Sequence, residues 1–166
     1  KSEHYTAMDA YAGRIYVNVD ENGNAGSNPV DITGNLRTHG QWVGAGTPGY
    51  INVALTTPDS FWIGRADATH VGGAIGAVKL WLQNGATWTN QDGGFRYGWV
   101  PFYSMHELSR VMELHGGADE EHRGVLKMPY ATVNFVDREN KAHSWSGASP
   151  LYVHNYNGHT LALYER

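Results

Sequence analysis

Short runs of alternating apolar and polar residues, separated by turns rich in glycine, asparagine and proline, recur along most of this chain. In Arg14 to Asp20 the residues Ile15, Val17 and Val19 alternate with their neighbours, and Tyr50 to Leu55 alternates in the same way. A period of two is typical of a strand with one buried face. Further runs of this kind occupy 29–32, 41–43, 60–64, 74–82 and 125–137, the last interrupted by Pro129. The pattern predicts a mainly β protein.

The turns between these runs indicate hairpins. Asn84-Gly85 is flanked by alternating residues, which is the strongest short-range hairpin signal, and a hairpin here would put Trp81 opposite Trp88. Asp20 to Asn24 predicts a further turn, because asparagine and glycine tolerate a positive φ. Near the C-terminus Asn157-Gly158 predicts a second hairpin. Its register would pair His154 with Leu161 and Tyr152 with Leu163.

Two segments follow helical spacing instead. Ser104 and Glu107 form a capping box, and an apolar stripe with a period near 3.6 follows before Gly116-Gly117. This predicts a helix over Met105 to His115, and similar spacing predicts a short helix over Ser2 to Ala12. No internal repeat of fixed period is visible. We therefore expect one domain over 1–166, an antiparallel β-sandwich or jelly roll with one inserted helix at about 105–115.

Charge and composition restrict the class of partner. The twelve Lys and Arg residues are scattered and the net charge is −4, which argues against nucleic acid because phosphate binding needs clustered cations. No run approaches the roughly 20 apolar residues of a transmembrane helix. Only 17% of the residues are charged, while the chain has 10 Tyr, 6 Trp and 21 Gly. Such a composition is typical of surfaces that bind ligands through aromatic and small polar side chains.

No motif predicts catalysis, a metal or a cofactor. The sequence His106-Glu107-Leu108-Ser109-Arg110 resembles a zinc motif but has Arg110 in place of its second histidine. Asp20, Asn22 and Asn24 have the spacing of a calcium loop without its glycine and glutamate, so a hairpin turn is the better interpretation. There is no cysteine, no nucleophile elbow and no phosphate-binding glycine loop. One alternative stays open: His115, Glu121 and His122 could converge around the glycine turn and bind a metal.

Two aromatic-rich segments are the candidate binding surfaces. One precedes the predicted helix and the other is the C-terminal hairpin. Ring faces pack on sugars and on cations, and neighbouring Arg, Asn and His side chains orient a ligand through hydrogen bonds. Strand alternation would turn about half of these rings into the core. The candidate residues are Arg96, Tyr97, Trp99, Tyr103, Trp145, Tyr152, His154, Tyr156, Asn157 and His159.

These features favour a recognition domain without enzymatic activity. We expect a lectin-like domain, or a receptor-binding or coat domain of a virus or phage, that binds glycan or another cell-surface ligand. Such a domain would be a homo-oligomer on a virion or outside the cell, and Lys1 is compatible with a mature product or an excised domain. The alternative from another class is an enzyme that acts on polysaccharide through carboxylates, or through His and Tyr, in a β-sandwich cleft.

A second alternative comes from a resemblance. Gly64-Arg65-Ala66-Asp67, the small apolar run Val71 to Val78, and Val100-Pro101-Phe102 follow an order similar to that of the actinoporin family of pore-forming cytolysins. The resemblance implies a membrane-binding β-sandwich in which Val100, Pro101 and Tyr103 contact lipid head groups. The chain departs from that family because it is acidic and has no long apolar helix before its first strand.

Overall fold

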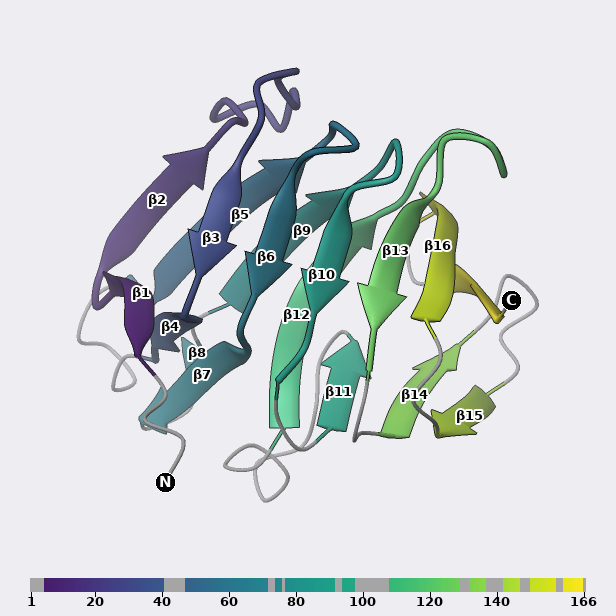
Figure 1. Cartoon of the computed structure of the whole chain (residues 1–166). Coiled ribbons are helices and arrows are strands. Elements are labelled where there is room, and N and C mark those ends of the chain that lie inside the picture. The colour runs from purple at the N-terminus through teal and green to yellow at the C-terminus, as the bar shows by residue number, and fades with distance from the viewer. Residues whose placement is uncertain are drawn as a thin grey trace.

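The alternating runs form strands in three sheets of the computed structural model (Figure 1). The structure describes residues 5–40, 47–71, 74–75, 77–91, 94–97, 108–128, 132–136, 142–146, 150–157 and 160–165. No helix is present in these ranges. Nor does any described segment have the length and hydropathy that a helical membrane crossing requires.

Each sheet collects strands from distant parts of the chain. The four-stranded sheet has the order β1 (Thr6–Ala10), β4 (Asn35–His39), β7 (Ala66–Val71) and β8 (Ala74–Ile75). The seven-stranded sheet has the order β15 (Ala142–Ser146), β14 (Thr132–Val136), β11 (Gly94–Tyr97), β12 (Leu108–His115), β9 (Ala77–Leu82), β5 (Gly49–Leu55) and β2 (Gly13–Val17). The six-stranded sheet has the order β17 (Thr160–Glu165), β16 (Pro150–Asn157), β13 (Gly124–Lys127), β10 (Thr87–Thr89), β6 (Phe61–Ile63) and β3 (Asp31–Thr33).

The chain visits the three sheets in turn and then begins again. It passes through β1, β2 and β3, then β4, β5 and β6, then β7, β9 and β10, and each strand pairs in parallel with its counterpart one circuit earlier. Figure 1 shows the six-stranded sheet in front of the seven-stranded sheet, with the short strands β1, β4 and β7 at one side. This is the arrangement of a parallel β-helix, in which each circuit of the chain is one coil.

One apolar core fills the space between the sheets. Corresponding positions in successive coils form rows, so that Ile32, Trp62, Trp88 and Leu126 lie side by side and are all buried. The Trp62 and Trp88 rings are parallel, with centroids 4.5 Å apart and an interplanar angle of 3°. The seven-stranded sheet contributes Ile51, Val53, Leu55, Val78, Leu80, Leu82, Val111 and Leu114, and the four-stranded sheet contributes Ala10, Leu36 and Ala66.

Backbone hydrogen bonds at a corner hold neighbouring coils together. Gly34 N donates to Ile63 O (2.8 Å), and Gly64 N donates to Thr89 O (3.0 Å), one coil further on. The indole N–H of Trp62 donates to Gly34 O (2.9 Å), and that of Trp88 donates to Gly64 O (3.0 Å). A Cβ at Gly64 would overlap the Gly34 carbonyl, so this close approach of coils requires glycine.

The expected antiparallel β-sandwich or jelly roll is wrong. Most strand pairs are parallel, and the antiparallel ones are β7 with β8, β13 with β16, β14 with β15, and β16 with β17. Alternation along a strand reports which face is buried, not the direction of the neighbouring strand. The coils also differ in length, as the unequal steps from Ile32 to Trp62, Trp88 and Leu126 show. That inequality hides the repeat from inspection of the sequence.

The helix predicted over Met105 to His115 is also wrong where the structure describes it. Leu108–His115 is strand β12, and 105–107 lie outside the described residues. The register shifts by one residue between Val111 and Glu113, a β-bulge that turns both Val111 and Leu114 into the core. The resulting spacing of three imitates a helical stripe. The helix predicted over Ser2 to Ala12 fails as well, because Thr6–Ala10 is β1.

The two predicted hairpins have different outcomes. Asn84 (φ 54°) and Gly85 (φ 80°) have the positive φ that a hairpin turn requires, but β9 and β10 lie in different sheets. The pair therefore turns a corner of the coil, and Trp88 lies beside Trp62 instead of Trp81. The C-terminal hairpin exists as β16 and β17, but its register is different, with Tyr156 beside Leu161 and Tyr152 beside Tyr164.

Several predicted elements are confirmed. Strands cover most of 14–20, 50–55, 60–64 and 74–82 and the second half of 29–32, and the run 125–137 contains one strand on each side of Pro129. The turn at Asp20 is confirmed by the antiparallel bridge between Val19 and Ala25. The predicted strand at 41–43 lies outside the described residues.

Candidate functional site

Polar side chains gather on the outer face of the seven-stranded sheet, opposite its core face. Parallel pairing puts Tyr16 (β2), Asn52 (β5), Lys79 (β9) and Glu113 (β12) in one row across four strands. A second row holds Ala54, Trp81 and His115. Since residues two apart on a strand share a face, these rows lie next to each other on the same surface.

The loop between β2 and β3 forms a wall beside these rows. Asn18 has a φ of 54°, and its amide nitrogen lies 3.0 Å from both Asn28 O and Ala54 O, which ties the loop to β5. The Asp20 carboxylate accepts the backbone N–H groups of Asn22 and Asn24 at 2.8 Å and the side-chain amide of Asn24 at 2.7 Å. Its hydrogen bond from the Asn24 side chain, followed by those from the backbone, lowers the pKa of Asp20.

A small apolar cluster packs the loop between β2 and β3 against the seven-stranded sheet. Val19 packs with Ala54 and Trp81 in a cluster separate from the main core. Gly23 lies over the Trp81 ring, where a Cβ would come 3.6 Å from Cζ2. The loop is therefore fixed by packing as well as by hydrogen bonds, and its polar tip projects beside the two rows.

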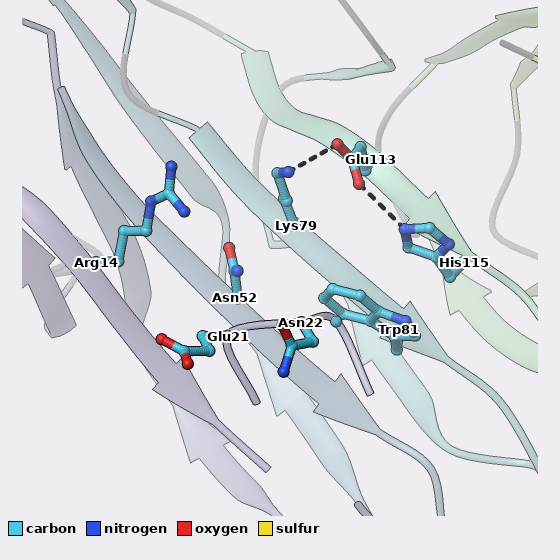
Figure 2. A pocket seen from close by; sticks show the side chains of 9 residues that line it. Arg14, Glu21, Asn22, Asn52, Lys79, Trp81, Glu113 and His115 are labelled. Carbon is cyan, nitrogen blue, oxygen red and sulfur yellow. Dashed lines mark hydrogen bonds and ion pairs between the residues drawn. The ribbon is translucent and has the colours of Figure 1, made fainter. Parts of the chain in front are cut away.

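Wall and sheet together enclose an outer-face pocket of about 340 Å³, which lies within the range of small-ligand sites (Figure 2). Its lining mixes two cations, two carboxylates, two amides and two rings. The lining residues are Arg14, Glu21, Asn22, Gly23, Asn52, Lys79, Trp81, Glu113 and His115.

One end of the outer-face pocket holds a chain of paired charges. Lys79 Nζ lies 2.8 Å from Glu113 Oε1, and His115 Nε2 lies 3.1 Å from Glu113 Oε2, so Glu113 lies between them (Figure 2). Partial burial disfavours the Glu113 carboxylate, but the hydrogen bonds from Lys79 and His115 outweigh burial and lower its pKa. The His115 ring stacks on Trp81 with centroids 4.6 Å apart. The charges at this end of the pocket are therefore paired with one another.

Asn52 has the most unusual environment in the outer-face pocket. Only 8% of this residue is exposed, and its Oδ1 has no hydrogen-bond partner among the described residues. A buried polar atom without a partner costs on the order of 1–3 kcal/mol. Asn52 lies between Tyr16 and Lys79 in the row, and it lines the pocket (Figure 2). The amide is therefore preorganised for a hydrogen bond that the described part of the protein does not supply.

Glu113→Gln tests the paired charges. Because the pKa of Glu113 is lower in the folded state than in the unfolded state, its ionised carboxylate stabilises the fold at pH values above the ordinary glutamate pKa. This contribution is lost as the pH falls through the lowered folded-state pKa. The side chain is 34% exposed, so we expect a stability loss of about 1 kcal/mol at most near pH 7, shrinking toward acidic pH. Urea unfolding across the acidic range measures it. The control is Glu120→Gln, at a side chain that is 78% exposed. If Glu113→Gln lowered the free energy of unfolding by the same amount at every pH, the charge argument would be contradicted.

The residues predicted from sequence lie elsewhere. Arg96 and Tyr97 are on β11 and Trp145 is on β15, both in the seven-stranded sheet, whereas Tyr152, His154, Tyr156 and Asn157 are on β16 in the six-stranded sheet. Among them the structure describes the side chain of Tyr152, which is half-buried with the guanidinium of Arg123 4.4 Å from its ring centroid. Trp99, Tyr103 and His159 lie outside the described residues.

The alternative metal site is not formed by the described residues. His115 pairs with Glu113, and His122 Nδ1 lies 2.5 Å from Asp119 Oδ1. No group of three potential ligands converges in the part of the chain that the structure describes.

Sequence reasoning missed the residues of the outer-face pocket. One signal was present: Lys79 and Trp81, like Glu113 and His115, are two residues apart, so each pair shares a face of its strand. Their meeting depends on parallel register, which the sequence does not reveal. Comparison of the chain with protein-family models, curated proteins and solved structures found no match.

Proposed function

We propose that the chain is a recognition domain that binds glycan in the outer-face pocket. The observation that carries this proposal is Asn52, a buried residue that lines the pocket and whose Oδ1 has no hydrogen-bond partner among the described residues. Sugar hydroxyls both donate and accept hydrogen bonds, so a saccharide suits a lining that mixes amides, carboxylates and cations. A purely anionic or cationic ligand would satisfy only part of that lining.

The position of the outer-face pocket supports the same function. Sites built on strands hold their side chains more precisely than sites on loops, and six of the nine lining residues come from the four strands β2, β5, β9 and β12. Glu113 is held as an anion by Lys79 and His115, which does not suit the proton donor that sugar hydrolysis needs. Binding without turnover is therefore the better proposal. We propose further that the domain acts as a homo-oligomer, either outside a cell or on a virion surface.

The cytolysin alternative is not proposed further. The actinoporin resemblance implied a β-sandwich, whereas the sheets here are mostly parallel. Its lipid-contacting positions Val100, Pro101 and Tyr103 lie outside the described residues.

Asn52→Leu tests the proposed function. We expect the substitution to weaken glycan binding roughly tenfold or more, because the ligand loses its hydrogen bond to the amide. The free energy of unfolding should stay the same or rise, since the buried oxygen without a partner is removed. A glycan array followed by calorimetry on the glycans that bind measures the first effect, and urea unfolding measures the second.

The control is Thr87→Val, which is also a polar-to-apolar change but at a half-buried residue of the six-stranded sheet. We expect it to leave binding unchanged. Three results would contradict the proposal: no glycan bound by the unaltered chain, equal binding by Asn52→Leu, or release of reducing ends from any glycan that binds.

A further inference from the structure

The charged residues of the outer-face pocket fall into two sets. Lys79, Glu113 and His115 are paired with one another at one end. Arg14 and Glu21 lie at the other end, and neither forms an ion pair within the described residues (Figure 2). Charge is thus available to a ligand at the end where Arg14 and Glu21 lie.

Arg14 is the better positioned of these two. Its guanidinium carbon lies 5.4 Å from the centre of the Tyr50 ring, and a hydrogen bond to Tyr16 raises the pKa of the guanidinium. Tyr50 on β5 is the register partner of Arg14, and Tyr16 lies two residues further along β2 on the same face. Both rings therefore lie beside the arginine on the outer face of the sheet. Glu21 instead projects from the exposed tip of the loop. A planar guanidinium held in this way suits a carboxylate, which it binds through two parallel hydrogen bonds.

We propose that the saccharide bound in the outer-face pocket is an acidic sugar whose carboxylate pairs with Arg14. This inference rests on the proposed function. With the carboxylate at Arg14, the sugar hydroxyls lie over Asn52 and reach toward Lys79. Glu21 accepts hydroxyl donors, and its negative charge selects against ligands that carry many closely spaced anionic groups. The ligand class is therefore a glycan with an isolated uronic acid, not a sulfated polyanion.

The experiment compares three oligosaccharides by calorimetry: one that contains a single uronic acid, the same chain with that carboxylate reduced to a primary alcohol, and a counterpart with an amino sugar. We expect the unaltered chain to bind the uronic acid roughly tenfold more tightly than the reduced form. Arg14→Gln should abolish this preference, so that the acidic sugar and its reduced form bind with equal affinity. Arg14→Lys should retain part of it, because lysine keeps the charge but loses the planar fork.

Lys127→Gln is the control, since it makes the same change of charge at an exposed residue of the six-stranded sheet. One outcome would overturn the acidic-sugar inference and leave the proposed function standing. In it, the unaltered chain binds the acidic and reduced sugars equally tightly, and Asn52→Leu binds neither. Tighter binding of the amino sugar would overturn the inference in the same way and point to Glu21. Failure of the unaltered chain to bind any of the three, with no glycan bound on the array, would overturn the proposed function itself.

Discussion

Trp88→Ala is expected to lower the free energy of unfolding by roughly 3 to 5 kcal/mol, the usual cost of emptying a large buried aromatic site. Trp88 is fully buried, and its ring lies parallel to that of Trp62 at 4.5 Å. The substitution also removes the indole donor of Gly64 O at the corner of the coil. Both losses act at the contact between neighbouring coils, and such contacts are one of the two contributions to the stability of a solenoid. Urea unfolding followed by far-ultraviolet circular dichroism measures the change.

Tyr5→Ala is the matched control, because Tyr5 is an aromatic residue that is 72% exposed. We expect its effect to stay within about 0.5 kcal/mol, as for most surface substitutions. Trp88→Phe should have an intermediate effect, since phenylalanine keeps most of the ring contact but not the N–H donor. A Trp88→Ala variant within 1 kcal/mol of the unaltered chain would show that the parallel tryptophan pair is not part of the core.

Several of the strands were predictable from the sequence, because burial of one strand face imposes an alternation that any β protein shares. Gly49–Leu55 and Phe61–Ile63 fall where alternation predicts them. Strand direction was not predictable for the same reason: parallel and antiparallel neighbours both bury every second residue. Asn84 and Gly85 illustrate the limit, since a positive φ suits both a hairpin and a corner of a coil.

The false helix has a comparable cause. A single extra residue between Val111 and Glu113 changes the inward spacing on β12 from two to three. Together with the capping-box sequence before it, this spacing is indistinguishable from one turn of a helix. The local preference of this segment for a helix is therefore outweighed by its pairing with β9, a strand far away in the sequence.

The outer-face pocket depends on register to a still greater degree. Asn52, Lys79 and Glu113 come from three coils, and no local pattern relates them. A slip of one residue in any of the three strands would turn its polar residue into the core. The sequence could indicate that each residue lies on a polar strand face, whereas their meeting at one pocket requires the stacked coils.

Asn18 connects the loop that forms one wall of the outer-face pocket to the seven-stranded sheet. Its amide nitrogen lies 3.0 Å from Ala54 O and from Asn28 O, and its Oδ1 accepts the backbone N–H of Asn28 at 3.3 Å. Its φ of 54° is tolerated by asparagine and glycine better than by other residues. The same residue therefore sets the direction of the loop and ties it to β5.

Asn18→Ala is expected to destabilise the fold by roughly 2 to 4 kcal/mol, because it removes these hydrogen bonds and puts alanine at a positive φ. Glycan binding should become undetectable by calorimetry, since the loop that forms one wall of the outer-face pocket loses its attachment to the sheet. Asn18→Gly separates the two causes: it accepts the φ without strain but lacks the amide, so it should recover about 1 kcal/mol of stability without recovering binding. If Asn18→Gly bound glycan as tightly as the unaltered chain, the attachment of the loop to Ala54 would not be needed to form the pocket.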